Sequence, residues 1–416
     1  MTHIDVGRRS PGAGSGATSR PYTTKGDDTL KVCLVDASLF TGPYDQALMG
    51  GLRAMGDDVR LYTCVMPQGS TLGRDCDVIQ SFYHLSAGPP FSHLPETLSR
   101  WCKGLDHAPS MRRLVDELAA WRPDVIHFQW TPIPIVDRWF LARLRRIAPI
   151  ICTVHDTSPF NGSPSSRIQN IGAHDILTKF DAIIVHTDQG RIRFEKPKQR
   201  IKNIRKIPHG LLPAPRGVIE TPQCVEASGI STLDILLFGK VKPYKGVDVL
   251  ICALSLLSSE DRAKCRARVV GKPYMDTRIL KDLAASLGVS GVVQFDFRHV
   301  EDHEVPGLFD SASVVVLPYR EIDASGVLST AVAMGRPVIA TNIGGFAELL
   351  SNDSDAILVS PNDAHGLSLA LHRVIQDAAL RDHLAAGIRK LRDATPSWVD
   401  IGHSTHRLYE QLVENR

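Results

Sequence analysis

Residues 236–250, LLFGKVKPYKGVDVL, place several lysines between a predicted strand and a predicted helix. The apolar run 235–238 is typical of a buried strand, and residues 246–257 carry apolar side chains at helical spacing. The basic side chains between them are Lys240, Lys242 and Lys245. Ligands bind at the carboxyl ends of strands in open α/β sheets, and a helix amino terminus attracts anions. The pattern therefore indicates a phosphate site, with a solvated basic turn as the alternative.

The same alternation of short apolar runs and amphipathic helices extends from residue 30 to the carboxyl end. Continuous runs such as KVCLVD (31–36) and SVVVLP (313–318), separated by helices, favour parallel sheets that are covered on both faces. We therefore predict an α/β protein with two doubly wound, Rossmann-like domains whose parallel sheets face a central cleft. The predicted parts are a disordered tail (1–28), a first domain (29–212), a linker (213–231), a second domain (232–395) and a carboxyl-terminal helix (396–416) that packs back on the first domain.

Composition and charge exclude several classes of protein. The 416 residues carry a net charge of only +3, so we expect no nucleic-acid partner. The eight cysteines are scattered without a C-x-x-C pair, which is typical of reduced thiols in the cytoplasm and gives no metal site. No apolar run reaches 18 residues, and the polar amino terminus lacks the apolar segment of a signal peptide. We therefore expect a cytoplasmic protein without a transmembrane helix.

Two longer stretches carry a resemblance to a known family. In GKVKPYKGVDVL (239–250) and VVVLPYREIDASGVLSTAVAMGRPVIATNIGGFAELL (314–350) the chain resembles the GT-B glycosyltransferases, and it is most similar to the retaining enzymes of family 4, also called group 1. The segments DVIHFQW, ICTVHD, IPHG and PSWVDIGHSTHRLYEQL add to this resemblance. It implies transfer of a hexosyl group from a nucleotide-diphosphate sugar to a glycan or lipid-linked acceptor, in polysaccharide or glycoconjugate biosynthesis. It implies neither a metal ion nor another cofactor.

The resemblance places the donor at the basic turn. In the family, a glycine and a basic residue at the strand end, followed by a Lys-Gly pair, hold the donor diphosphate; an arginine is usual where Lys240 stands. A second anion contact is expected at the helix that begins after Ser325, because this residue is a good N-cap and leaves free N–H groups. The implied donor-binding residues are Gly239, Lys240, Lys245, Ser325, Gly326, Val327 and Thr330. We expect Glu348 to begin the next helix, where an acid suits the helix dipole.

The chain departs from the family pattern at two acidic positions. The family often carries two glutamates eight positions apart, and the matching residues here are Ile322 and Thr330. Glu321 and Asp323 flank the first position, so either is a candidate catalytic carboxylate beside the transferred sugar. The Thr330 hydroxyl is a candidate partner for the ribose. This departure keeps two alternatives open: a nucleotide-sugar epimerase or hydrolase on the same fold, and a non-catalytic nucleotide-sugar-binding protein.

Residues of the first domain complete the predicted site. His155 ends the strand in TVHD, and the matching family histidine lies near the transferred sugar, which makes it a catalytic candidate. His127 and His186 also end strands, so either lines the acceptor side or has a structural role. Gly42 opens the first helix in a loop that could receive donor phosphate or acceptor.

Two basic segments raise the question of membrane contact. Residues 191–206 hold eight basic residues and one acid, and helix 138–146 adds four arginines beside apolar side chains. A basic amphipathic surface docks on anionic lipid, and the alternative is a solvated face. The sequence thus predicts either a purely cytoplasmic protein or peripheral contact with the inner membrane surface.

Overall fold

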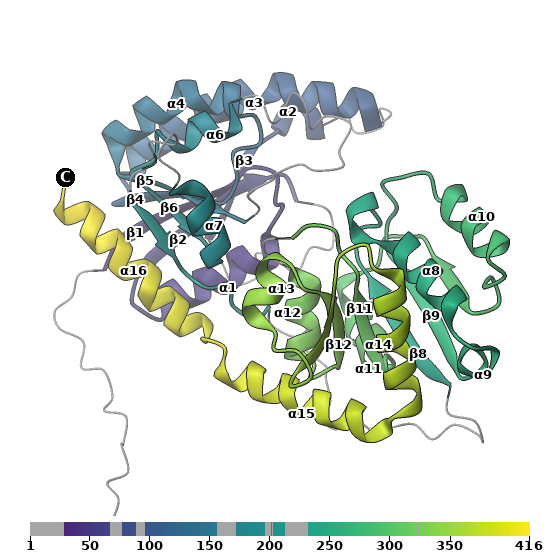
Figure 1. Ribbon diagram of the computed structural model, residues 1–416. Coiled ribbons are helices and arrows are strands. Elements are labelled where there is room, and N and C mark those ends of the chain that lie inside the picture. Colours follow the sequence, from purple (N-terminus) through teal and green to yellow (C-terminus); the bar gives the residue numbers. More distant parts are fainter. Residues whose placement is uncertain are drawn as a thin grey trace, which may run out of the picture.

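The computed structural model describes residues 29–66, 77–88, 96–155, 172–195, 201, 203–212, 232–322 and 325–416. The predicted tail and linker lie outside these residues. The described chain forms an amino-terminal and a carboxyl-terminal half, each built around one parallel sheet (Figure 1). This arrangement confirms the predicted pair of doubly wound α/β units.

The amino-terminal sheet has seven strands in the order β3-β2-β1-β4-β5-β6-β7. The strands are β1 (Lys31–Asp36), β2 (Asp58–Cys64), β3 (Asp77–Phe82), β4 (Val125–Phe128), β5 (Ile150–Val154), β6 (Ala182–Val185) and β7 (Ile204–Lys206). The helices are α1 (Gly42–Arg53), α2 (His84–Ala87), α3 (Glu96–Trp121), α4 (Pro134–Ile147), α6 (Ala173–Leu177) and α7 (Asp188–Phe194). One face packs against α3 and α4, and the other packs against α1 and the carboxyl-terminal helix α16 (Trp398–Glu414).

The carboxyl-terminal sheet has six strands in the order β10-β9-β8-β11-β12-β13. The strands are β8 (Leu233–Phe238), β9 (Cys265–Val270), β10 (Val293–Asp296), β11 (Val314–Leu317), β12 (Val338–Thr341) and β13 (Ala356–Val359). The helices are α8 (Val247–Leu256), α9 (Ser259–Ala263), α10 (Arg278–Ser286), α11 (Val305–Asp310), α12 (Gly326–Ala333), α13 (Gly344–Leu349), α14 (Ala364–Gln376) and α15 (Ala378–Ala394). Both sheets reverse their strand order beside the first strand, the position where doubly wound sheets bind ligands.

Burial on both faces explains the continuous apolar runs of the central strands, such as residues 235–238 and β11. Successive residues of β8 point to opposite sides of the sheet, so Ile235 and Leu237 join the core with α8 and α14, while Leu236 joins the core with α12 and α15. A strand covered on both sides has no solvent face, and an alternating polar pattern would bury unpaired polar groups. The apolar runs therefore predicted parallel strands correctly.

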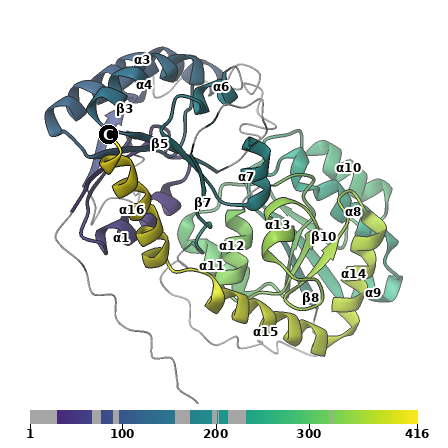
Figure 2. The same ribbon diagram turned by 60° about the vertical axis from the view of Figure 1, so that its left-hand side comes forward.

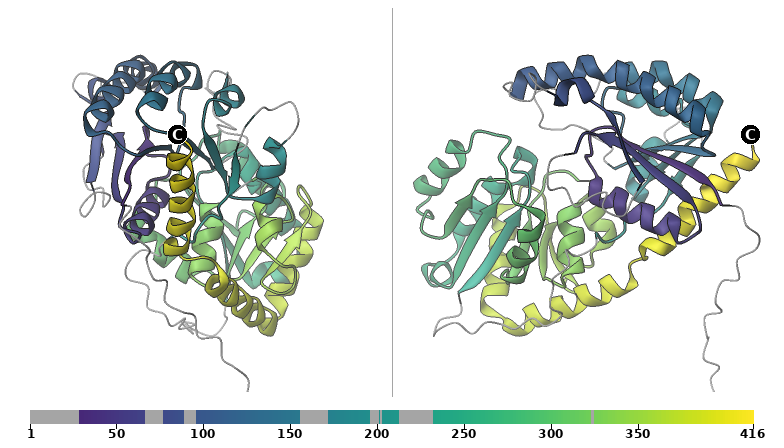
Figure 3. Two further views of the ribbon diagram at one scale, coloured as in Figure 1. Left: turned by 90° about the vertical axis from the view of Figure 1, so that its left-hand side faces the viewer. Right: turned by 180° about the vertical axis from the view of Figure 1, so that it is seen from behind.

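The carboxyl-terminal helix connects the two halves. Helix α15 belongs to the carboxyl-terminal half and ends at Ala394, and after residues 395–397 α16 runs along α1 of the other half (Figure 3). The two helices approach closely at a pair of glycines, because a Cβ on Gly402 would lie 2.3 Å from the backbone carbon of Gly51. A hydrogen bond of 2.9 Å between His406 and Asp57 extends the contact.

Replacing Gly402 with alanine tests this helix contact. The added methyl group would overlap the α1 backbone, so we expect the free energy of unfolding to fall by about 1 to 3 kcal/mol. Gly50→Ala is the matched control, because its Cβ would meet no atom within 4 Å and alanine favours a helix. Urea unfolding of both variants measures the difference. Equal stability of the two variants would contradict the close packing.

Candidate active site

Three lysines gather where β8 and β9 end. Lys240 follows β8, Lys245 ends the short 3-10 turn Pro243–Lys245, and Lys272 follows β9. The side chain of Lys245 is only 7% exposed. Its Nζ donates to the hydroxyl of Tyr319 over 2.5 Å and lies 3.9 Å from the centre of that ring. We call these residues, together with Lys242, the lysine cluster.

Burial and mutual repulsion destabilise the charged form of this cluster. Burial, followed by the charges of Lys242 and Lys240, lowers the pKa of Lys245 to about 7. Lys240 is exposed, yet desolvation by the surrounding protein and the nearby Lys272 lower its pKa as well. No carboxylate among the described residues forms an ion pair with Lys240, Lys245 or Lys272. An anion bound at the cluster would relieve this repulsion.

Close backbone contacts fix the geometry of the cluster. Gly246 has φ +68, and a Cβ there would lie 2.0 Å from the carbonyl oxygen of Pro318. Gly271 has φ +146, and its Cβ would lie 2.1 Å from the carbonyl oxygen of Gly239. Only glycine allows these approaches. The second contact joins the ends of β8 and β9, and it brings in Lys272, which the sequence analysis missed although VVGK repeats the Gly-Lys pair that follows β8.

The amino terminus of α12 lies beside the lysine cluster. Ser325 is its N-cap, and the Ser325 hydroxyl accepts a 3.2 Å hydrogen bond from the backbone N–H of Leu328. A Cβ on Gly239 would lie 3.3 Å from a methyl of Val327 and 3.9 Å from the Nζ of Lys245. The structure thus brings together most of the predicted donor residues, which come from two separate segments of the chain.

The structure gives less support for a donor role of the remaining predicted donor-side residues. Thr330 donates its hydroxyl hydrogen to the carbonyl of Gly326 over 2.9 Å, so only its lone pairs remain for a ligand. Glu321 is exposed on the segment between β11 and α12. Asp323 lies outside the described residues.

Three histidines, which we call the histidine cluster, lie at the strand ends of the amino-terminal half. They are His155, His186 and His209. His155 Nδ1 lies 3.2 Å from His186 Nε2, and His155 Nε2 lies 3.0 Å from Gln129 Oε1. The ring of Tyr44 packs against all three, at centroid distances of 4.7, 5.4 and 5.1 Å.

The hydrogen bonds of this cluster determine where its protons are. Burial lowers the pKa of His186 to about 3. Burial also lowers the pKa of His155, and the neighbouring His186 lowers it further. Both rings are therefore neutral near pH 7. The Ile207 carbonyl, 2.9 Å from His186 Nδ1, can only accept, so His186 carries its proton on Nδ1. His155 then donates from Nδ1 and accepts at Nε2, which requires a half-turn of the Gln129 amide so that its N–H₂ faces the ring. A neutral His155 can orient a ligand, but it is not a strong acid.

His127 and Gly42 have surroundings that differ from those of His155. His127 is fully buried, and its two nitrogens lie 2.6 Å from the Tyr409 hydroxyl and 2.7 Å from the Thr153 hydroxyl. This geometry connects α16 to the sheet and favours the structural role over the acceptor role. Gly42 is the buried first residue of α1.

A cavity of about 290 Å³ lies between the two halves. His186 and His209 line it from the amino-terminal half, and Ser325 and Phe346 line it from the carboxyl-terminal half. Two predicted site residues that are far apart in sequence, His186 and Ser325, therefore contribute to one cavity.

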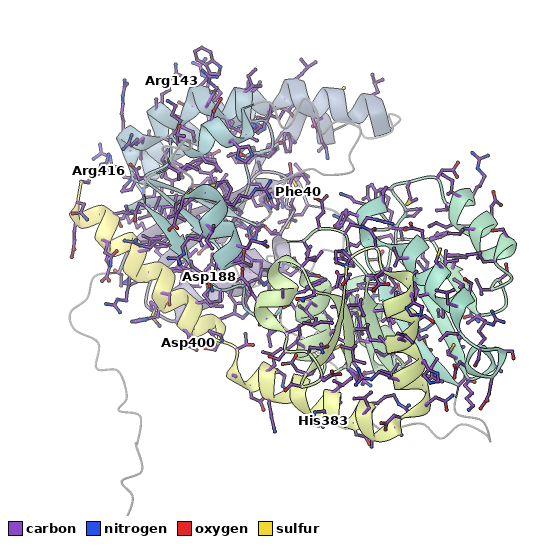
Figure 4. The ribbon with its side chains drawn as sticks, viewed as in Figure 1. Phe40, Arg143, Asp188, His383, Asp400 and Arg416 are labelled. Carbon is purple, nitrogen blue, oxygen red and sulfur yellow. The ribbon has the colours of Figure 1, made fainter. Side chains whose placement is uncertain are left out.

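Glu348 joins the halves next to this cavity. Its carboxylate accepts hydrogen bonds of 2.7 Å from the backbone N–H groups of Asp188 and Gln189, at the amino terminus of α7. Helices α7 and α13 are neighbours in Figure 2. Figure 4 shows Asp188 on the side of the amino-terminal half that faces the other half. The expectation that Glu348 begins its own helix is wrong, because α13 begins at Gly344. Its charge instead complements the dipole of a helix in the other half.

Comparisons with known proteins identify the family. The model of a glycosyl transferase 4-like domain matches residues 41–202, and the model described as glycosyl transferases group 1 matches residues 232–377. Together these matches cover more than half of the chain. The chain belongs to the group 1 glycosyltransferases. This result confirms the predicted family 4 relationship and makes the protein a transferase.

Individual relatives of this glycosyltransferase are distant. D-inositol 3-phosphate glycosyltransferase of Streptosporangium roseum is 25% identical over 341 residues, which cover 74% of this chain and 73% of that protein. For two other relatives of this name the alignments reach only 62% and 35% of their lengths. Sucrose-phosphate synthase from Thermosynechococcus elongatus has a TM-score of 0.71 and 19% identity, with 93% of this chain and all of that one covered. Anabaena HepE, solved with UDP and glucose, has a TM-score of 0.69 and 18% identity, with 92% and 100% covered. These structures confirm the GT-B fold.

Replacing Lys245 with methionine should separate stability from binding. The substitution removes a buried ammonium group whose charged form the fold disfavours, so we expect the free energy of unfolding at pH 7 to rise by about 1 to 3 kcal/mol. The affinity for UDP should fall about ten- to a hundredfold, because a charge-assisted contact is lost. Urea unfolding and calorimetric titration measure the two effects. Lys281→Met, at an exposed position of α10, is the control and should change neither. Unchanged UDP affinity in the Lys245 variant would exclude this lysine from the anion site.

Proposed function

We propose that this glycosyltransferase moves a sugar, with retention of configuration, from a nucleoside diphosphate sugar to a hydroxyl of a glycan or lipid-linked acceptor. The observation that carries the proposal is the lysine cluster beside the amino terminus of α12. A buried cation without a carboxylate partner is unfavourable unless an anionic ligand is bound. Anabaena HepE was solved with UDP and glucose, which supports a uridine nucleotide as the first donor to test.

The lysine cluster would act mainly on the leaving group. When the bond between the sugar and the diphosphate breaks, negative charge grows on the phosphate oxygens. Lys240, Lys245 and the N–H groups of α12 are positioned to stabilise that charge more strongly in the transition state than in the bound donor. A phosphate oxygen of the leaving group then receives the proton of the attacking hydroxyl. We propose that the positive charge of the cluster makes a metal ion unnecessary.

His155 would orient the transferred sugar. Its neutral ring is held by His186 and Gln129, and it stacks on Trp130 at a centroid distance of 5.4 Å and an interplanar angle of 22°. Because Nδ1 donates to His186, a sugar hydroxyl could bond only Nε2, in the place that Gln129 occupies. We propose that the closed arrangement of the two halves, stabilised by Glu348, keeps water away from the sugar.

Donor binding and turnover test the proposed function. Calorimetry with UDP, GDP and ADP should identify one nucleotide that binds, and the corresponding nucleoside should bind much more weakly, because it lacks the charges that the cluster neutralises. The matching nucleotide sugar should then release its diphosphate faster when a probe acceptor is added, and EDTA should leave that rate unchanged. D-inositol 3-phosphate is a reasonable first probe, given the name of several relatives. Release of the diphosphate at a rate that no acceptor changes would favour a nucleotide-sugar hydrolase. Nucleotide binding without any turnover would favour a non-catalytic binding protein.

A lipid-linked acceptor would bring the protein to a membrane surface, and α4 offers the matching surface. None of the described helices is long and apolar enough to cross a bilayer. One face of α4 carries exposed residues at helical spacing, namely Ile135, Arg138, Trp139, Ala142, Arg143 and Arg146. Trp139 is 72% exposed, and Figure 4 shows Arg143 at the outer edge of this half. The other predicted segment contributes less, because its Lys206 forms ion pairs with Asp188 and Glu348 and residues 196–200 lie outside the described ones.

Paired substitutions on α4 test the membrane contact. We expect Trp139→Ser with Arg143→Gln to weaken binding to vesicles that contain phosphatidylglycerol by about tenfold or more, because an apolar anchor and a charge are both lost. The matched control is Ile279→Ser with Arg278→Gln, which removes an exposed apolar residue and an exposed arginine from α10. Vesicle sedimentation measures both variants. Equal effects of the two pairs, or binding that does not respond to the anionic lipid, would refute a specific α4 surface.

A further inference from the structure

Four hydrogen-bonded side chains connect the interior of the amino-terminal half to the loop after β1. Asp137 Oδ1 lies 2.6 Å from His107 Nε2, His107 Nδ1 lies 3.0 Å from the hydroxyl of Tyr83, and that hydroxyl lies 3.4 Å from the hydroxyl of Ser38. The Asp137 and His107 side chains are fully buried, whereas Ser38 is only partly buried. We call this series the Ser38 relay. It contains none of the residues assigned above to the donor.

The chemistry of the relay gives it a direction. A carboxylate can only accept, so with a neutral imidazole the Nε2–H of His107 donates to Asp137, and Nδ1 accepts from Tyr83. The second oxygen of Asp137 accepts from the backbone N–H of Ile133 over 3.1 Å. The Tyr83 oxygen then accepts from Ser38, whose own lone pairs point out of the relay. Each hydrogen bond polarises the next, which strengthens the Ser38 oxygen as an acceptor.

The backbone around Ser38 is strained. Leu39 and Tyr83 have φ angles of 51 and 61°, in the left-handed region that residues other than glycine rarely adopt. Strain of this kind persists only where the surrounding structure enforces it, and it clusters at functional sites. Leu39 directly follows Ser38 in the loop, and Tyr83 is its partner in the relay. Both strained residues therefore help to fix the position of the Ser38 hydroxyl.

An exposed aromatic ring follows Ser38 two residues further along the same loop. Phe40 is 48% exposed, and its ring meets Trp130 edge-on at a centroid distance of 5.7 Å. Trp130 stacks in turn on His155, which joins the loop to the histidine cluster. Figure 4 shows Phe40 at the edge of the amino-terminal half nearest the other half. A polarised hydroxyl and an exposed aromatic ring on one short loop suit a ligand that has both hydroxyl groups and an apolar C–H face.

We propose that Ser38 accepts a hydrogen bond from a hydroxyl of a sugar or cyclitol ring whose C–H face lies on Phe40. This ring belongs to the acceptor, so the inference rests on the proposed function. Ser38 touches the ligand, while Tyr83, His107 and Asp137 are positioning residues that act through it. No proton leaves the relay.

Variants of the relay, compared in the presence of UDP, test the proposal. The probe ligands are inositol, methyl glucoside and octyl glucoside, titrated by calorimetry into the complex of the protein with UDP. We expect Ser38→Ala and Tyr83→Phe each to weaken the best probe about tenfold, and the double variant to be no worse than either. Ser38→Thr, which keeps the hydroxyl, should bind as the wild type does. Ser86→Ala is the matched control, because it removes a buried hydroxyl whose partner among the described residues is the backbone carbonyl of Tyr83.

The measurements separate a positioning role of the relay from a purely structural one. UDP should bind all variants equally, so a loss confined to polyol affinity marks a positioning role. In urea the two relay substitutions should be non-additive in the free energy of unfolding, because both remove the same hydrogen bond. The relay is refuted if Tyr83→Phe leaves the polyol affinity unchanged. It is also refuted if Ser86→Ala lowers the polyol affinity as much as the relay substitutions do. Wild-type protein that binds UDP but none of the polyols overturns the acceptor site. Wild-type protein that binds no nucleotide overturns the proposed function instead.

Discussion

The ammonium group of Lys245 is buried between the rings of Tyr319 and Tyr244, and no carboxylate of the described residues neutralises it. An isolated buried charge of this kind is costly, and the fold responds by lowering its pKa rather than by pairing it. The surrounding architecture keeps the charge there: Gly246 allows the turn to approach Pro318, and Gly271 draws the end of β9, with its own lysine, against Gly239. The fold thus holds a buried lysine without a neutralising carboxylate among the described residues, which is the basis for the proposed anion site.

The rest of the molecule places other groups around this charge. Helix α16 ties the two halves together through its close contact with α1, and Glu348 caps a helix of the opposite half. Ser329 of α12 adds another link, since its hydroxyl accepts from the backbone N–H of Leu212 over 2.9 Å. These contacts bring the strand ends of the amino-terminal half, with their histidines, toward the carboxyl-terminal half. A transferase needs this arrangement, because donor and acceptor must meet in one place from which water is excluded.

The sequence predicted what depends on local pattern. The run 235–238 is apolar because both faces of its strand are covered, and the spacing of Lys240, Lys245 and Ser325 follows from the strand and helix that hold them. It missed what depends on contacts between distant segments. Lys272 joins the cluster only because Gly271 meets Gly239. Glu348 was expected to complement the dipole of its own helix, because nothing in the sequence shows that the amino terminus of α7 lies next to it. The tautomers of His155 and His186 follow from a single backbone carbonyl, that of Ile207, which no motif marks.

The central claim is that Lys245 binds the diphosphate of the donor. The uptake of a proton when UDP binds tests this claim most directly. In the free protein the pKa of Lys245 is about 7, so near pH 8 the Lys245 side chain is neutral in most of the molecules. A bound diphosphate would favour the charged form and raise this pKa, so UDP binding at pH 8 should take up nearly one proton per site. Calorimetric titration of UDP in buffers of different ionisation enthalpy measures this uptake, and Lys245→Met should abolish it. A binding heat that is independent of the buffer in the wild-type protein would contradict the account.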